Sequence, residues 1–175
     1  MRRWIVFAAS GLVILAAGVA GVGMLLPKTH RASRTVMYDA TPATVFGMIT
    51  DFARFPEWRS GIRAVETIET GDGKTRFTQQ GPNGTIRYAV EMREPHSRLV
   101  TRIDDPSLPF AGTWTFDLRP VGGGTELTIT EDGEVYNPIF RFLSRVVFSP
   151  SSTIDTYQTD LRERLRRPAG DDRRR

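Results

Sequence analysis

The sequence predicts an α+β domain in which a curved antiparallel sheet of about six to seven strands surrounds a long C-terminal helix, preceded by an N-terminal transmembrane helix. Apolar and polar residues alternate through residues 62–135, which is the period of half-buried strands. In residues 151–166 the apolar residues recur three and four apart, as in an amphipathic helix. Residues 4–26 contain no charged side chain, as expected for a membrane span.

The N-terminal segment, residues 1–27, is predicted to be a single transmembrane anchor. A helix over its 23 uncharged residues would be about 34 Å long, enough to cross a hydrocarbon core of about 30 Å. A cleaved signal peptide is the alternative, with small residues at Gly18, Val19 and Ala20, and a buried globular helix is a third. The apolar run continues past Ala20, which favours the anchor. The short basic tail in front of it slightly favours a folded domain outside the cytoplasm.

The folded region is expected to open with one strand and two short helices. Thr41 suits a helix N-cap, and Pro42 suits the first helical position. Pro56 ends the second helical piece, because proline disfavours the helical conformation in the residue before it. The predicted elements are a basic linker over residues 28–34, a strand over 35–40, and helical segments over 43–49 and 51–55.

Six further strands and two helices are expected to follow. Turn residues such as Gly122–Gly124 separate the strands by only a few positions, which favours an antiparallel meander. A helical period returns at Pro138, breaks at Pro150, and resumes to form the long C-terminal helix. Residues 168–175 form an Arg-rich tail that we predict to be disordered. The expected strands cover residues 62–70, 74–80, 85–94, 98–104, 113–119 and 125–135.

The net charge of +4 is distributed unevenly along the chain. Residues 1–34 contain five basic residues and no acidic one, and residues 162–175 contain seven arginines against three acids. Residues 35–161 are acidic, with 12 basic and 17 acidic residues. A nucleic-acid-binding domain normally carries a basic face on the domain itself, so we expect no nucleic-acid partner.

The residue inventory excludes several chemistries. The chain has no cysteine, which rules out disulfides, a thiol nucleophile and a Cys-ligated zinc. Its two histidines, His30 and His96, make a His-rich metal site unfavourable, and no cofactor is predicted.

Four segments of the chain are distinctive, namely residues 40–46 (ATPATVF), 50–58 (TDFARFPEW), 112–116 (GTWTF) and 124–129 (GTELTI). They resemble the START-like superfamily, also called SRPBCC, the polyketide cyclase/dehydrase and lipid-transport group. The resemblance extends over about residues 33–167 and implies the helix-grip fold for a domain over residues 35–167. It also implies a deep, mostly apolar pocket between the sheet and the C-terminal helix, although the superfamily uses this pocket for many tasks.

Large aromatic residues are the candidates to bind a ligand in this implied pocket. An apolar ligand is bound there because burying its surface is worth about 25 cal/mol per Å². Each of these residues is also compatible with an ordinary place in the core. The predicted ligand-binding residues are Trp58, Phe77, Tyr88, Trp114, Phe142 and Tyr157.

Polar candidates give weaker signals. His30 is interpreted as an interfacial residue after the membrane span, and His96 as part of a turn. Glu131 lies next to Asp132 in a strand, where neighbours point to opposite faces, so solvent exposure is the simpler interpretation. Arg141 and Arg145 are four apart on one helix face, and are expected to be solvated or to meet an anionic headgroup.

The resulting hypothesis is a membrane-tethered domain that binds a hydrophobic small molecule or lipid and acts as a non-catalytic carrier or sensor. One alternative is a cyclase/dehydratase-like enzyme, which Tyr88, Glu131 or another polar residue buried at the pocket floor with a shifted pKa would favour. The other is a protein-interaction module with a vestigial cavity. The sequence leaves the ligand and the oligomeric state open.

Overall fold

The computed structural model describes residues 11, 18–69, 74–82, 84–146 and 151–167. Most of the predicted membrane span and the predicted disordered tail, residues 168–175, lie outside these residues. Of the span, residues 18–25 are helical. No helix within the described residues combines the length and the apolar character needed to cross a membrane.

Seven antiparallel strands form one curved sheet with the order β1-β7-β6-β5-β4-β3-β2. The six strands predicted between residues 62 and 135 are confirmed, and they pair in meander order. β1, the first strand in the chain, pairs with β7, the last one, along the edge that the meander leaves open. The strands are β1 (Thr29–Tyr38), β2 (Ala64–Glu69), β3 (Arg76–Gly81), β4 (Gly84–Glu94), β5 (Arg98–Ile103), β6 (Phe110–Val121) and β7 (Gly124–Val135).

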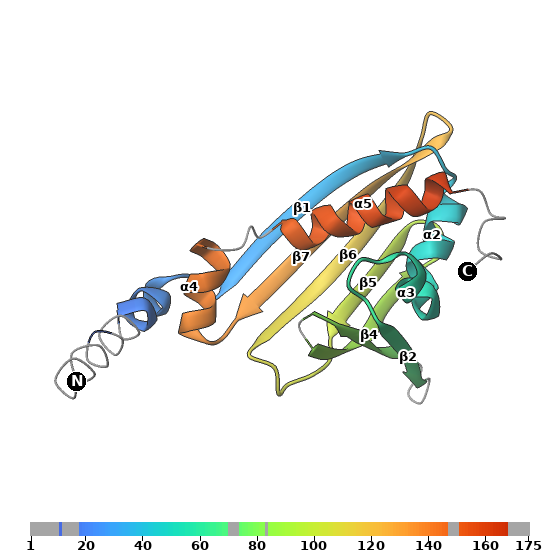
Figure 1. Ribbon diagram of the computed structural model, residues 1–175. Helices are drawn as coiled ribbons and strands as arrows, with labels where there is room; N and C mark the ends of the chain where they lie inside the picture. The colour runs from blue at the N-terminus through green and yellow to red at the C-terminus, as the bar shows by residue number, and fades with distance from the viewer. Residues whose placement is uncertain (1–10, 12–17, 70–73, 83, 147–150, 168–175) are drawn as a thin grey trace, which may run out of the picture.

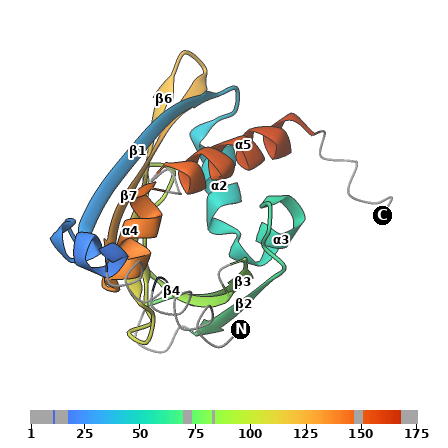
Figure 2. The same cartoon turned by 60° about the vertical axis from the view of Figure 1, so that its left-hand side comes forward.

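The helices gather on one side of this sheet. α5 lies across the concave face, while α2 and α3 lie beside the end of the sheet that is opposite α4 (Figures 1 and 2). α4 follows β7 and lies at the end of the molecule where β1 begins. Their bounds are α2 (Pro42–Thr50), the 3-10 turn η1 (Phe52–Arg54), α3 (Phe55–Trp58), α4 (Pro138–Val146) and α5 (Ser152–Arg166). Pro56 does not end a helical piece, as the sequence predicted, but lies in the first turn of α3, where the missing N–H of proline needs no intrahelical partner.

The first strand is longer than predicted. It begins at Thr29 and not at residue 35, so nearly all of the segment interpreted as a basic linker, residues 28–34, is paired with β7. The physical reason is that a strand starting at residue 35 would leave residues 129–134 of β7 without a partner strand on that edge. Arg34 in this stretch also binds the start of α5, through Ser151 Oγ at 2.8 Å and Asp155 Oδ1 at 3.2 Å.

Local signals at the start of α2 and along α5 are confirmed. Thr41 caps α2, because its Oγ1 accepts a hydrogen bond from the Thr44 N–H at 3.2 Å. The predicted apolar stripe of α5 packs on the sheet, where Ile154, Tyr157 and Leu161 are fully buried. The sheet and α5 therefore form the two walls between which a cavity remains.

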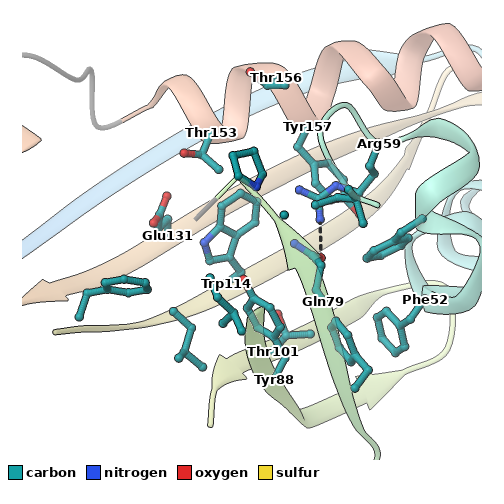
Figure 3. A pocket seen from close by; sticks show the side chains of 18 of the residues that line it. Phe52, Arg59, Gln79, Tyr88, Thr101, Trp114, Glu131, Thr153, Thr156 and Tyr157 are labelled. Carbon is teal, nitrogen blue, oxygen red and sulfur yellow. Dashed lines mark hydrogen bonds between the residues drawn. The ribbon is translucent and has the colours of Figure 1, made fainter. Parts of the chain in front are cut away.

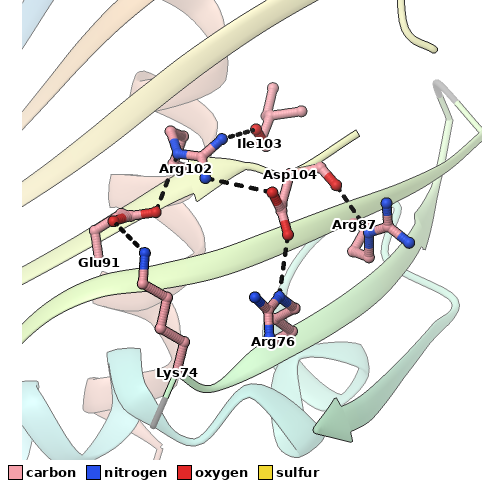
Figure 4. Close-up of polar contacts among 7 residues, drawn as sticks. All are labelled: Lys74, Arg76, Arg87, Glu91, Arg102, Ile103 and Asp104. Atoms are coloured by element: carbon pink, nitrogen blue, oxygen red, sulfur yellow. Dashed lines mark hydrogen bonds and ion pairs between the residues drawn. The ribbon is translucent and has the colours of Figure 1, made fainter. Parts of the chain in front are cut away.

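The outer face of the sheet is polar and carries a chain of ion pairs across β3, β4 and β5 (Figure 4). Glu91 binds Lys74 at 3.1 Å and Arg102 at 3.0 Å. Asp104 binds Arg102 at 3.3 Å and Arg76 at 3.1 Å. These side chains alternate along the strands with residues that face the cavity, so the two faces of the sheet have opposite character.

Candidate ligand-binding cavity

A cavity of about 540 Å³ lies between the concave face of the sheet and α5 (Figure 3). This volume is within the usual range for small-molecule sites, about 300–1,000 Å³. More than half of the lining residues are aromatic or aliphatic, and polar residues such as Arg59, Gln79, Thr101 and Glu131 complete the wall. The apolar lining includes Ile49, Phe52, Phe55, Phe77, Leu99, Ile103, Phe110, Trp114 and Phe116.

Stacked rings form one side of the cavity. Phe77 on β3 stacks on Phe52 at 4.1 Å between centroids and on Tyr88 at 5.1 Å. On the α5 side, the Tyr157 ring lies 5.4 Å from Phe116 and 5.9 Å from Trp114. Aromatic pairs at these distances fix the ring orientations, so the wall is shaped before any ligand arrives.

Four of the six predicted binding residues line the cavity, namely Phe77, Tyr88, Trp114 and Tyr157. The other two are not among the lining residues. Trp58 supports the wall from behind, with its ring 5.4 Å from Tyr157 in an edge-to-face contact. Phe142 lies half-buried on α4, which packs beside the end of β7 and not over the concave face. Whether any of these residues binds a ligand remains a prediction.

Sequence reasoning missed the most unusual lining residue, Arg59. It follows α3 directly, and its guanidinium lies 4.4 Å from the centroid of the Tyr157 ring and 5.2 Å from that of Phe55. Its Nη1 donates to the Gln79 Oε1 at 3.1 Å (Figure 3). Within the described residues, no carboxylate pairs with it. A signal was present, because Arg59 is the residue after the matching segment that ends at Trp58.

The loop that carries Arg59 is held in place by α5. The buried Asp160 accepts hydrogen bonds from the Ser60 backbone N–H at 2.6 Å and from Ser60 Oγ at 2.7 Å. The Asp160 carboxylate thus fixes the residue next to Arg59 without touching the guanidinium. The arginine is positioned, and its charge remains available to the cavity.

Two polar atoms beside the cavity have no hydrogen-bond partner in the part of the chain that the structure describes. They are Arg59 Nε and the Tyr157 hydroxyl, both buried. A buried donor without a partner costs about 1–3 kcal/mol, so such atoms favour a ligand or a water that brings an acceptor.

The electrostatics of this part of the cavity follow from its low polarity. Burial raises the pKa of Tyr157 and of Tyr88 well above that of a free tyrosine, with the Arg59 charge acting in the opposite direction. Burial lowers the pKa of the Arg59 guanidinium. Both tyrosines therefore keep their protons at neutral pH, and they serve as hydrogen-bond donors and not as bases.

A second polar group of the cavity is formed by Glu131 on β7 and His30 on β1. Their side chains are mostly buried, and His30 Nε2 lies 3.9 Å from Glu131 Oε1. His30 is opposite Gly133, where any larger side chain would overlap the imidazole ring. Burial raises the pKa of the Glu131 carboxyl, and a hydrogen bond from Trp114 opposes this.

This placement corrects one expectation. Glu131 lines the cavity and is not a solvated strand end. His30 lines the cavity as well, and its position at a membrane interface stays a prediction. The adjacent Asp132 points to the outer side and pairs with Arg31 at 3.6 Å, as strand alternation requires. The sequence missed the inward side of this strand because either face of a short alternating segment is compatible with its pattern.

Arg141 also differs from its expected exposed position. Its side chain is buried and donates to backbone carbonyls of Val135, Tyr136, Gly23 and Leu26. It therefore ties α4 to the segment before β1 and does not reach the cavity. The Arg145 side chain lies outside the described residues.

The fold and the cavity define a helix-grip domain with an internal cavity. The model of the family described as polyketide cyclase/dehydrase and lipid transport matches residues 29–163, and the chain belongs to this family. No curated protein matches the chain.

Solved structures support the fold. A START superfamily protein from Mycobacterium smegmatis is 21% identical, with a TM-score of 0.63 over 78% of this chain and 97% of that one. The Zhui aromatase/cyclase from Streptomyces sp. R1128 is 13% identical, with a TM-score of 0.65 over 81% of this chain and 98% of that one. At these identities the likeness shows the fold alone.

Proposed function

We propose that the protein is a membrane-tethered START-like domain that binds a hydrophobic small molecule or lipid in its cavity and acts as a non-catalytic carrier or sensor. The observation that carries this proposal is a mostly apolar cavity of about 540 Å³ with one arginine, Arg59, in its wall. The ligand best suited to it is amphipathic, with an apolar body and an anionic or carbonyl oxygen that meets the guanidinium.

The apolar wall supplies the affinity in this proposal, and the polar atoms supply the selectivity. Burying a ligand against stacked rings is worth about 25 cal/mol per Å² of apolar surface. Arg59 Nε and the Tyr157 hydroxyl need acceptors, and both are donors at neutral pH. An oxygen-bearing group would satisfy them. A hydrocarbon would leave them unpaired.

The tether is the sequence-based part of this proposal. The uncharged run of residues 4–26 is long enough to span a bilayer as a helix, and it leads directly into the folded domain. An anchor would keep the cavity near a supply of amphipathic molecules.

The test uses the full chain in mild detergent and two dyes. The first is 1-anilinonaphthalene-8-sulfonate, which is aromatic and anionic, and the second is Nile red, which is apolar and neutral. We expect both dyes to bind. Arg59→Met should weaken the binding of the anionic dye about tenfold to a hundredfold, which is the value of a hydrogen bond to a charged group, and should leave the binding of Nile red unchanged.

Arg119→Met is the matched control, because Arg119 is exposed and pairs with Glu126 outside the cavity. It should bind both dyes like the unaltered chain. Failure of either dye to bind the unaltered chain, or equal losses of both dyes in Arg59→Met, would overturn the proposal. Native mass spectrometry of protein from its own membrane then identifies the natural ligand.

A second candidate function, a cyclase/dehydratase-like enzyme, is favoured by Glu131 and His30. A carboxyl with a raised pKa beside an imidazole in an apolar cavity is an arrangement suited to proton transfer. Turnover of a bound polyketide-like chain that is lost in Glu131→Gln, while binding of that chain is retained, would select this function. A vestigial cavity is disfavoured by the open volume.

A further inference from the structure

The pattern of α4 is inverted relative to a helix that packs on a core. Its apolar residues Ile139, Phe140 and Leu143 are 42%, 55% and 37% exposed, while its charged Arg141 is only 4% exposed. A helix in water normally buries the apolar side and exposes the charged one. The apolar side of α4 is therefore available to an apolar environment outside the domain.

Arg141 joins α4 to the helix of residues 18–25. Its guanidinium donates to Gly23 and Leu26 carbonyls at 3.0 and 3.2 Å, and to Val135 and Tyr136 carbonyls at 3.0 Å each. Carbonyls at a helix C-terminus lack intrahelical donors, and the guanidinium supplies them. The two helices lie side by side (Figures 1 and 2) and form one unit.

Gly23 allows this close contact. A side chain at this position would overlap the backbone of Pro138, the first residue of α4. The contact therefore depends on a glycine in one helix as well as on an arginine in the other. Gly23 makes the space for this pair of helices, and the Arg141 hydrogen bonds join them.

Exposed apolar side chains are concentrated on this unit. Of the ten large apolar side chains exposed in the described residues, six lie on the two helices and a seventh, Tyr136, lies two residues before α4. The remaining three are spread over β1, β4 and β6. We call this set the apolar end face: Val22, Met24, Leu25, Tyr136, Ile139, Phe140 and Leu143.

We propose that the apolar end face lies in the interfacial layer of a lipid bilayer. The helix of residues 18–25 is the last part of the uncharged run of residues 4–26, so the face is continuous in sequence with the proposed span. The exposed Lys28 follows at the height where anionic headgroups would lie. Aromatic side chains such as Tyr136 suit the same layer.

This docking orients the cavity. His30, Phe110 and Val135 line the cavity, and they belong to the ends of β1, β6 and β7 that adjoin α4. A domain that lies on its apolar end face would hold this end of the cavity toward the lipid. The inference rests on the proposed tether, and it deepens the proposed function by assigning the bilayer as the partner.

The absence of cysteine in the chain permits a direct test by single-cysteine labelling. Phe140→Cys in the full chain is labelled with the fluorophore NBD and reconstituted in phosphatidylcholine/phosphatidylglycerol vesicles. Val121→Cys is the matched control, because Val121 is 45% exposed and lies at the far end of β6. This position is about 36 Å from Phe110, which is at the end that adjoins α4. Part of the vesicles carries doxyl-labelled lipid, which quenches NBD on contact.

We expect a blue shift and loss of fluorescence to doxyl lipid at position 140, and neither at position 121. A vesicle-bound chain with equal signals at both positions would overturn the docking and leave the tether intact. A chain absent from the vesicle fraction would overturn both. A blue shift without vesicles that rises with protein concentration would assign the face to a second copy and overturn the proposal. Dye binding in the cavity is measured separately and does not depend on these outcomes.

Discussion

α4 and α5 are consecutive amphipathic helices that use their apolar sides in opposite ways. α5 turns Ile154, Tyr157 and Leu161 into the core, where each is fully buried. α4 turns Phe140 outward and buries Arg141 against backbone carbonyls. A periodic pattern therefore predicts a helix with an apolar side, while the surroundings decide what covers that side. The concave sheet covers the apolar side of α5, whereas no described element covers the exposed apolar side chains of α4.

Truncating one apolar side chain on each helix should give the largest contrast. Leu161→Ala removes a fully buried side chain and is expected to lower the free energy of unfolding by about 2–5 kcal/mol. Phe140→Ala removes a side chain that is more than half exposed, and should change the free energy of unfolding by about 0.5 kcal/mol or less. Urea unfolding of the full chain in detergent measures both. Similar losses in the two variants would mean that α4 is packed like α5.

The fold was largely predictable from sequence because its signals are local. Alternation along β6 placed Trp114 and Phe116, and a threonine and a proline marked the start of α2. The start of β1 was not predictable in this way. The length of its partner β7 determines it, and its own residues give a weak strand signal.

The candidate site was predictable only in its apolar part. Ring-bearing residues on alternating strands indicate a wall, and four of the six proposed ones are in it. Arg59 was not found, and solvent exposure was the simpler expectation for Glu131, because a charged residue normally indicates a surface. Their inward positions depend on tertiary contacts, such as the bond between Asp160 and Ser60, that no local pattern records.

Substitution of Arg141 and of Arg59 should change the stability of the domain in different ways. Arg141→Met leaves carbonyls of both joined segments without their donor, and should cost at least about 1–3 kcal/mol. Arg59→Met replaces a charge that lacks a carboxylate partner by an apolar side chain, and should leave the stability unchanged or raise it. Hydrogen exchange should show faster exchange in residues 18–25 for Arg141→Met only.

Arg141→Lys provides the control for that comparison. Lysine keeps the charge but lacks the planar fork that reaches several carbonyls at once. We expect hydrogen exchange in residues 18–25 to be as fast in this variant as in Arg141→Met. Protection at the level of the unaltered chain would show that charge alone joins the helices, and would contradict the role given to the guanidinium geometry.

The inner and outer faces of the sheet should differ in the sign of their pH dependence. Burial raises the pKa of Glu131 above its ordinary 4.5, so the folded state binds this proton more tightly than the unfolded state. The resulting stabilisation is complete below about pH 4.5 and is lost as the pH rises through the raised pKa. As the pH rises through the pKa of Glu131, the Glu131→Gln variant should therefore become more stable relative to the unaltered chain.

Urea midpoints across a pH series measure this difference, with His30→Gln as the background that removes the neighbouring imidazole. The same sign in both backgrounds is expected, because burial is the main cause of the shift. A Glu131→Gln curve parallel to that of the unaltered chain would show that the carboxyl is solvated and would contradict its place in the cavity.

The smallest effect is expected on the outer face, at Glu91. Its hydrogen bonds with Lys74 and Arg102 lower the pKa of this carboxyl, so its stabilisation is present above about pH 4.5 and is lost as the pH falls. Exposed pairs are worth about 0–1 kcal/mol and are screened by salt. Glu91→Gln should therefore cost less than about 1 kcal/mol at neutral pH, and less still in high salt. A larger loss that persists in salt would mean that the outer network holds the sheet as strongly as the inner core does, because screening weakens exposed charges but not buried apolar contacts.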